Sequence, residues 1–399
     1  MLALDRIYHA AYVLKGVARK TDLIAAPHLV SGMEDLYLKT ENLQVTGSFK
    51  LRGASYKISQ LPKGDLERGI IACSAGNHAQ GVALAATRMG VRSIVCMPDG
   101  APIMKVESTR RLGAEVRLVK GSYDDAHDEA VRLQEKTGAT LIHPYDDEDV
   151  ICGQGTIGLE IMDQLEGIDA VVVPVGGGGL ISGVACAVKS LKPSCQVFGV
   201  QAAGASAMAE SFRRGDWYAS DTASTFADGI AVKNPGEITF QMVGKYVDDI
   251  VTVSDDEIAA AILNLMERQK VVAEGAGAVP VAAAMFDKLP LAGKRVVCVV
   301  SGGNIDVNIL SRVINRGLAM SGRKVTMEIR LTDKPGQLQQ VSTIIAELGA
   351  NVVSVDYDLS DPDLPISSCT LRVGMETRDQ AQIDQIRAKL VGEGFALVG

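Results

Sequence analysis

The sequence predicts an α/β protein: two doubly wound parallel-sheet domains, with a ligand in the cleft between them, followed by a ferredoxin-like βαββαβ domain. Strands alternate with helices from Ile70 to Val300, and this order implies parallel pairing through right-handed crossovers. After Arg316 the pattern becomes strand–helix–strand–strand–helix–strand, which is typical of the ferredoxin-like fold. Of the 399 residues 47% are hydrophobic and only 4% aromatic, so we expect aliphatic cores.

The two sheets are expected to interleave along the chain. We assign residues 1–318 to a catalytic region, with residues 1–48 and 146–318 in its larger domain and residues 49–145 in its smaller one. Residues 319–324 are expected to be a linker, and residues 325–399 to form the third domain.

The elements follow from runs of apolar residues and their spacing. In the smaller domain we expect strands at 70–73, 93–97, 115–119 and 140–142, with helices at 82–89, at 105–112 and ending at 133. In the larger domain we expect helices at 153–165 and 258–266, and strands at 170–175, 195–200 and 295–300. In the third domain we expect strands at 325–331, 352–359, 368–375 and 395–398, and helices at 337–348 and 378–389.

Charge and cysteine usage restrict the partners and the compartment. The chain has 48 acidic and 40 basic residues, a net charge of −8, and no block of Lys or Arg. We therefore expect neither nucleic acid nor a membrane as a partner. The seven cysteines form no C-x-x-C pair and no signal peptide is recognisable, so we expect a cytoplasmic protein.

Lys50 is the first candidate for chemistry. It follows a short strand-like run, Leu36–Lys39, and opens a helical pattern. A lysine at such a turn lies near the positive end of the helix dipole, which helps to keep its amine uncharged. An uncharged amine is a nucleophile that can form a Schiff base with the aldehyde of pyridoxal phosphate. Taken alone, the same pattern also fits a solvated surface lysine.

Four consecutive glycines, Gly176, Gly177, Gly178 and Gly179, stand between an apolar strand and a helix. Without Cβ atoms the backbone can approach a phosphate closely, and the following helix dipole adds to the attraction. A dinucleotide site is the rival, but it requires an acidic residue about 20 positions later. Here the next strand ends at Gln201, so a small phosphorylated ligand fits better than a dinucleotide.

Two further turns follow strands. Ser74, Ala75, Gly76, Asn77 and His78 offer amides and a hydroxyl for a carboxylate, and Asn77 offers a donor for a phenolate, although an ordinary helix N-cap is the alternative. In Ser301-Gly302-Gly303-Asn304 the Ser301 hydroxyl can hydrogen-bond a pyridine nitrogen without protonating it.

With these motifs together, residues from about Lys20 to Arg316 resemble pyridoxal-phosphate enzymes of the tryptophan-synthase-β fold type, and specifically the threonine dehydratases. The tail resembles a single ACT domain. The resemblance makes Lys50 the Schiff-base lysine and Ser74 a second catalytic residue. It places Phe49 beside the ring, Asn77 on the ring hydroxyl and Ser301 at the pyridine nitrogen. It assigns Gly176 to Leu180 to the phosphate, and Ser74 to His78 to the substrate carboxylate. Gly229 and Glu274 match positions near the cofactor, with a packing turn or an N-cap as the alternative.

Two departures from related proteins matter. Serine racemases of this fold type carry a second serine where this chain has Ala75. Relatives that bind a divalent cation have acidic ligands where this chain has Gln201 and Ala207. We therefore expect neither racemase activity nor a metal site at that position.

The resemblance implies dehydration and deamination of L-threonine to 2-oxobutanoate and ammonia. One methyl group gives only ~1–3 kcal/mol of discrimination, so L-serine is expected to react as well. The alternatives are a serine or 3-hydroxyaspartate dehydratase and, third, a serine racemase. Two alternatives come from other functional classes: a catalytically inactive amino-acid sensor and an NAD-dependent dehydrogenase.

The tail is expected to bind an amino-acid effector. Asp333, Pro335, Gly336 and Gln337 follow the first strand of the tail and precede its first helix. ACT domains resembling this one bind small amino acids at such loops, so isoleucine is the first candidate, with valine acting in the opposite sense. The nucleotide effectors of related catabolic enzymes come next. A dimerisation module without a ligand is the alternative. Enzymes of this fold type also lead us to expect a homodimer or homotetramer.

Overall fold

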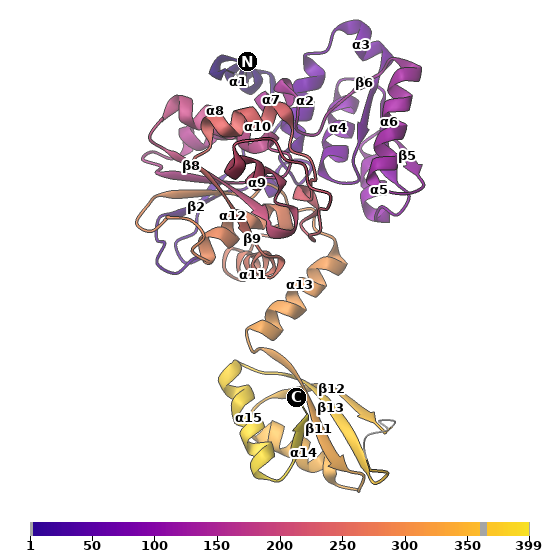
Figure 1. Ribbon diagram of the computed structural model, residues 1–399, viewed down its shortest axis with the longest axis vertical. Coiled ribbons are helices and arrows are strands. Elements are labelled where there is room, and N and C mark those ends of the chain that lie inside the picture. The colour runs from indigo at the N-terminus through magenta and orange to yellow at the C-terminus, as the bar shows by residue number, and fades with distance from the viewer. Residues whose placement is uncertain (1–2, 360–364, 399) are drawn as a thin grey trace. The chain divides into compact units, whose positions relative to one another are not determined.

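The computed structural model describes residues 3–359 and 365–398. The chain forms two compact units, Met1–Asp306 and Val307–Gly399. The first unit contains two largely parallel sheets and the second an antiparallel sheet, so the predicted fold class is confirmed (Figure 1).

The smaller sheet of the first unit is parallel throughout, in the order β5-β4-β3-β6. Its strands are β3 (Ile70–Cys73), β4 (Ser93–Pro98), β5 (Glu115–Val119) and β6 (Thr140–Leu141). Its helices are α2 (Lys50–Ser59), α3 (Lys63–Arg68), α4 (Asn77–Arg88), α5 (Ile103–Arg111) and α6 (Tyr123–Thr137). Apolar residues of α2, α4 and α5 pack on one face of this sheet and those of α6 on the other.

The larger sheet has the order β1-β2-β10-β7-β8-β9, with only the β1–β2 pair antiparallel. Its strands are β1 (Leu23–Ala25), β2 (Leu36–Lys39), β7 (Ala170–Pro174), β8 (Gln196–Ala202), β9 (Asp249–Val253) and β10 (Val296–Val299). The accompanying helices are α1 (Leu4–Val13), η1 (Glu41–Leu43), α7 (Glu148–Gln164), α8 (Gly179–Leu191), η2 (Ala203–Ala205), α9 (Ala207–Arg214), η3 (Asp228–Ile230), α10 (Glu237–Tyr246), α11 (Asp255–Asn264), the π-helical η4 (Leu265–Gln269) and α12 (Gly275–Met285).

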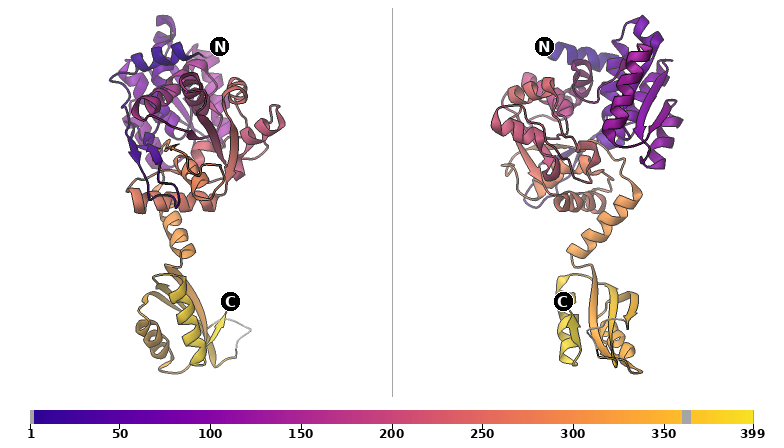
Figure 2. Two further views of the ribbon diagram at one scale, coloured as in Figure 1. Left: turned by 90° about the vertical axis from the view of Figure 1, so that its left-hand side faces the viewer. Right: turned by 45° about the vertical axis from the view of Figure 1, so that its right-hand side comes forward.

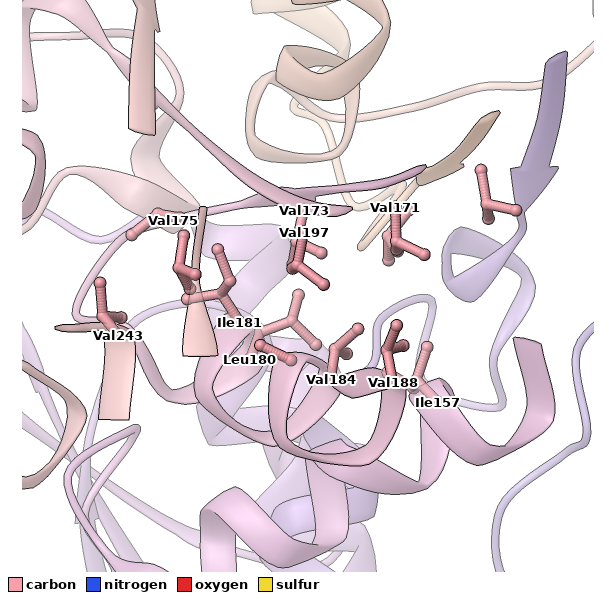
Figure 3. Packing of buried hydrophobic residues seen from close by; sticks show 14 of the residues in the cluster. Ile157, Val171, Val173, Val175, Leu180, Ile181, Val184, Val188, Val197 and Val243 are labelled. Atoms are coloured by element: carbon pink, nitrogen blue, oxygen red, sulfur yellow. The ribbon is translucent and has the colours of Figure 1, made fainter. Parts of the chain in front are cut away.

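The main core lies between this sheet and α7 and α8 (Figure 3). Val171 and Val173 of β7 and Val197 of β8 point from the sheet towards Val184 and Val188 of α8. Strands covered on both faces become continuous apolar runs, which is why Val171 to Val175 contains no charge. Each such buried valine contributes about 1.5–3 kcal/mol by leaving water, so this core holds the strand ends in fixed positions.

Several element boundaries differ from the expectation, and three of them affect how the site or the units are defined. Helix α4 begins at Asn77 rather than at residue 82, because Gly81 lies where the helix packs against the backbone of Lys50 and does not interrupt it. Helix α7 begins at Glu148 because the Asp147 carboxylate accepts from two backbone amides of the first turn. Helix α13 (Val307–Met320) covers the expected end of the catalytic region and the first two residues of the expected linker.

The second unit continues after α13 with β11 (Lys324–Thr332), α14 (Gln337–Glu347), β12 (Asn351–Asp358), β13 (Ser368–Glu376), α15 (Gln380–Gly392) and β14 (Ala396–Val398). The antiparallel order is β12-β13-β11-β14. Both α14 and α15 pack on one face of this sheet (Figure 2). This is the ferredoxin-like arrangement that the sequence predicts.

Across residues 3–359 and 365–398, no helix combines the length and the apolarity needed to cross a bilayer.

Candidate active site

The cavity that contains the predicted site has a volume of about 560 Å³ and lies in the first unit. It is reached by the segments that follow β3, β7 and β10, at the carboxyl ends of parallel strands from both sheets. Ligands of open α/β sheets bind at such ends. The fold therefore brings together the turns that the sequence singled out.

Lys50 is the first residue of α2, and its side chain enters this cavity. The Nζ atom donates to the carbonyl of Pro144 at 2.8 Å and lies 5.1 Å from the centre of the Phe49 ring. Burial lowers the pKa of Lys50 to about 8, although the charge of Glu274 acts in the opposite direction. With a pKa of about 8, roughly a tenth of this amine is uncharged at pH 7, far more than for an ordinary lysine, and the uncharged form is the one that acts as a nucleophile or a base.

The segment before Lys50 is joined to the segment after β10. The amide of Phe49 donates to the Ser301 carbonyl at 3.1 Å, and the amide of Gly303 donates to the Gly47 carbonyl at 2.9 Å. Ser301 is almost fully buried and lines the cavity. These bonds fix the position of the Ser301 hydroxyl relative to Lys50, although about 250 residues separate them in the sequence.

The glycine loop connects β7 to α8. The Gly176 carbonyl accepts from Gln201 Nε2 at 3.4 Å, and the Gly177 carbonyl accepts from Thr239 Oγ1 at 2.6 Å. In a planar trans peptide the next N–H points away from the carbonyl, so the amides of Gly177 and Gly178 point away from Gln201 and Thr239, and both glycines line the cavity. Together with the start of α8, they form an anion-binding cradle.

The loop requires glycine for two separate reasons. Gly178 has φ of +96°, in the left-handed region. A Cβ atom on Gly177 would lie 2.4 Å from the ring of Tyr145, so the loop passes close against that side chain. Tyr145 is held in place by a 3.0 Å hydrogen bond from its hydroxyl to the Asn234 carbonyl.

Asn77 is fixed from both sides of its amide. Its Nδ2 donates to Glu274 Oε1 at 2.6 Å, and its Oδ1 accepts from Asn304 Nδ2 at 2.8 Å. Asn304 also donates to the Thr46 carbonyl at 2.8 Å. Burial and the charge of Asp228 raise the pKa of Glu274 to about 7, while the bond from Asn77 acts against that increase. The second Nδ2 hydrogen of Asn77 is left to serve a ligand in the cavity.

The Ser74–His78 turn lines the cavity, as expected, with α4 beginning at Asn77. Ser74 Oγ accepts from the Gly76 amide at 3.2 Å. The His78 Nε2 atom lies 2.9 Å from the Ile142 carbonyl, and burial followed by the charge of Lys50 lowers the pKa of His78 to about 3. The neutral ring thus supports the turn from behind, because its Nε2–H donates to that carbonyl.

The remaining site residues predicted in the catalytic region also line the cavity, namely Ala75, Gly179, Leu180 and Gly229. A Cβ on Gly229 would lie 3.0 Å from Ala276 Cβ and 3.5 Å from Glu274 Oε1, so this turn packs directly on the start of α12. Asp333, Pro335, Gly336 and Gln337 belong to the second unit, in the loop between β11 and α14, where Gly336 has φ of +95°.

Several residues that line the cavity or, like Asn304, hydrogen-bond to a residue that lines it were not predicted as site residues. Asn304 and Asp228 each lie within motifs whose other residues were singled out, so the sequence did carry a signal for them. Tyr145, Lys105 and Lys233 carry no such signal. Only the folded chain brings them to the cavity, because no recognisable motif surrounds them in the sequence.

The groups in the cavity fit the predicted cofactor, pyridoxal phosphate. The cradle supplies donors for a phosphate, Lys50 an amine of lowered pKa, and Asn77 and Ser301 polar groups for the edges of a ring. At the position of the metal ligands of some relatives, Gln201 Oε1 accepts from the Ala209 amide at 2.7 Å. Among the described residues, no group of three or more His, Cys, Asp or Glu side chains is suited to hold a metal ion.

A family model described as pyridoxal-phosphate dependent enzyme matches residues 14–302. The L-threonine ammonia-lyase of Thermotoga maritima is 51% identical over 397 residues, which cover 99% of this chain and 98% of that protein. The solved structure of the processed form of threonine deaminase isoform 2 from Solanum lycopersicum is 39% identical, with a TM-score of 0.73 over 78% of this chain and 93% of that chain. The structure of maize serine racemase is 34% identical, with a TM-score of 0.74 over 80% of this chain and 98% of that chain.

Proposed function

Because the chain belongs to the pyridoxal-phosphate dependent enzyme family, we propose that it converts L-threonine to 2-oxobutanoate and ammonia and also accepts L-serine. The observation that carries this proposal is the Lys50 amine, which is enclosed between the glycine cradle and the Ser74–His78 turn. A relative named L-threonine ammonia-lyase that matches 99% of the chain supports the choice of substrate.

When bound, pyridoxal phosphate supplies an electron-accepting ring that stabilises negative charge on the substrate α-carbon. The amides of residues 177–180 would hold its phosphate, Asn77 would donate to the ring hydroxyl, and the Ser301 hydroxyl would hydrogen-bond the ring nitrogen. Because a serine hydroxyl does not protonate such a nitrogen fully, Ser301 would keep the ring a moderate electron acceptor. That suits a reaction in which a leaving group departs directly from the neighbouring carbon.

Residues of the chain position the substrate and move its proton. The amides and hydroxyl of Ser74–His78 bind the substrate carboxylate. The Lys50 amine takes the proton from the α-carbon, and the β-hydroxyl then leaves as water with a proton that the cofactor phosphate would supply. Water then hydrolyses the released enamine to the 2-oxo acid and ammonia. The cavity, with about 560 Å³ of space, is large enough for a substrate of this size.

The competing functions within the same class are weaker. Racemisation needs an acid on the face of the substrate opposite Lys50, and Ala75 provides no hydroxyl in the substrate turn. Dehydration of L-serine or 3-hydroxyaspartate uses the same residues, so comparing kcat/KM for the three substrates distinguishes them. Formation of D-serine from L-serine would favour the racemase instead.

The experiment is replacement of Lys50 by alanine in the full-length protein. We expect loss of 2-oxobutanoate formation and of the visible absorbance of bound pyridoxal phosphate. Lys63→Ala is the matched control, because the Lys63 side chain is 91% exposed outside the cavity. A Lys50→Ala variant that still forms 2-oxobutanoate at the normal rate would disprove the assignment.

We propose further that the second unit is an ACT-type regulatory domain that binds an amino acid at Asp333–Gln337. Its strand order and the left-handed Gly336 at the start of α14 support this proposal. Isoleucine is expected to inhibit and valine to oppose it, and coupling of ~1–3 kcal/mol changes activity about 5–150-fold. Both ligands are titrated against the full chain and a chain ending near Arg316. Unchanged kinetics and Tm of the full chain would refute the proposal, and an unchanged response of the shorter chain would move the site into the first unit.

Assembly and compartment complete the proposal. We expect a homodimer or homotetramer, and light scattering that gives a monomer at micromolar concentration would contradict it. All seven cysteines are buried free thiols, which supports a reducing cytoplasmic location.

A further inference from the structure

An ion pair crosses the cavity between the two sheets of the first unit. Lys105 lies in the first turn of α5, which packs on the smaller sheet, and Asp228 begins η3, which lies against α12 of the larger domain. The Lys105 ammonium donates to Asp228 Oδ2, and both residues line the cavity. The Lys105 side chain is only 18% exposed, whereas the Asp228 side chain is 59% exposed.

The pair lies within electrostatic reach of the reacting groups. Asp228 raises and Lys105 lowers the pKa of Glu274, the carboxylic acid that holds Asn77. A charge added next to Lys105 or Asp228 would therefore be felt at the place where the substrate is bound.

The other charges around the cavity already have partners. Asp124 and Lys233 approach each other to 3.6 Å, and Glu274 is hydrogen-bonded to Asn77. Lys50 is the reacting amine. If Asp228 lost its charge, Lys105 would lose the carboxylate with which it pairs in the cavity.

We propose that Asp228, by neutralising Lys105, makes the cavity selective for 2-amino-3-hydroxy acids with an uncharged third carbon, and disfavours those with a carboxylate there. This inference rests on the proposed function. A substrate with a second carboxylate must either displace Asp228 from Lys105 or place its charge beside Asp228. Either event costs free energy in a partly desolvated site, whereas L-threonine and L-serine cause neither.

The test compares full-length holoenzymes of the wild type, Asp228→Asn, Lys105→Met and the double variant. The steady-state substrates are L-threonine and L-threo-3-hydroxyaspartate. Asp228→Asn is expected to raise the kcat/KM ratio of hydroxyaspartate to threonine by ~10-fold or more, because an unpaired ammonium attracts the extra carboxylate. Adding Lys105→Met to Asp228→Asn is expected to remove the gain.

Binding of succinate, measured by calorimetry, gives a reading that does not depend on turnover. Asp228→Asn is expected to bind this dicarboxylate ~10-fold more tightly than the wild type. If the wild type does not consume L-threonine, the proposed function is refuted. If Asp228→Asn then still binds succinate more tightly than the wild type, the inference about charge selectivity stands.

The matched control is Asp124→Asn, which unpairs Lys233 at the same cavity. It should change neither the substrate ratio nor the succinate affinity as Asp228→Asn does. An equal gain in Asp124→Asn would overturn the inference, as would an unchanged ratio and an unchanged succinate affinity in Asp228→Asn.

Discussion

Replacing Arg52 by methionine is expected to destabilise the first unit severely. Arg52 is 1% exposed and makes two hydrogen bonds to Glu41, of 2.8 and 2.7 Å. It also donates to Glu160 Oε1 at 2.6 Å. Burial alone would raise the pKa of Glu41, but the charge and hydrogen bonds of Arg52 lower it below its usual value.

The magnitude follows from what the substitution leaves behind. Glu41 is fully buried and would keep only its 2.5 Å bond from Thr21 and the more distant charge of Lys39. Removing one partner of a buried pair costs about 3–5 kcal/mol. The variant should also lose stability as pH rises, because burial then raises the folded pKa of Glu41 above its unfolded value.

Urea unfolding followed by the fluorescence of Trp217 measures this loss. Trp217 is the single tryptophan and belongs to the first unit, so its signal reports on that unit. The double variant Arg52→Met/Glu41→Gln should recover much of the loss, because the unpaired charge is gone. A loss below ~1 kcal/mol for Arg52→Met, or a double variant less stable than the single one, would refute the argument.

Three further outcomes are expected. Gly177→Ala should weaken binding of pyridoxal phosphate at least ~10-fold, since the new Cβ would lie 2.4 Å from the Tyr145 ring, whereas Gly244→Ala, in open space, should not. Glu274 has a pKa of about 7 in the folded protein and 4.5 when unfolded, so it stabilises the fold fully below pH 4.5 and loses this contribution as pH rises through 7. Between pH 4.5 and pH 8 the free energy of unfolding should therefore fall by roughly 3 kcal/mol more for the wild type than for Glu274→Gln, as measured by the Trp217 assay. The rate at which cofactor-free protein binds pyridoxal phosphate should increase as pH rises, with a midpoint near pH 8, the pKa of Lys50. A midpoint near pH 10.5 would contradict the effect of burial on this pKa.

The sequence predicts the fold well because its strongest signals are local. The run from Val171 to Val175 and the four glycines define a strand, a turn and the start of a helix without any tertiary information. Helix starts are harder to predict, because they depend on capping residues outside the apolar runs. The first turn of α7 depends on the Asp147 cap, which precedes the apolar run from which that helix was recognised.

Some residues of the candidate site can likewise be predicted from local sequence, and others cannot. Lys50 lies in a motif that is recognisable on its own, and the structure places it in the cavity. Tyr145 and Lys105 could not be found, because their contribution depends on which backbone passes beside them. The ring of Tyr145 matters only because Gly177 packs against it, and Lys105 only because Asp228 reaches it.

The chain passes between the two sheet layers once just before Lys50 and again after Pro144, and the Lys50 amine is bonded to the Pro144 carbonyl. If the smaller sheet and its helices rotated relative to the larger sheet, the rotation axis would pass through these two adjacent crossings. Atoms on the axis of a rotation hardly move, whereas atoms remote from it sweep through an arc. The reactive amine would therefore keep its place while the walls of the cavity open to admit substrate and release product.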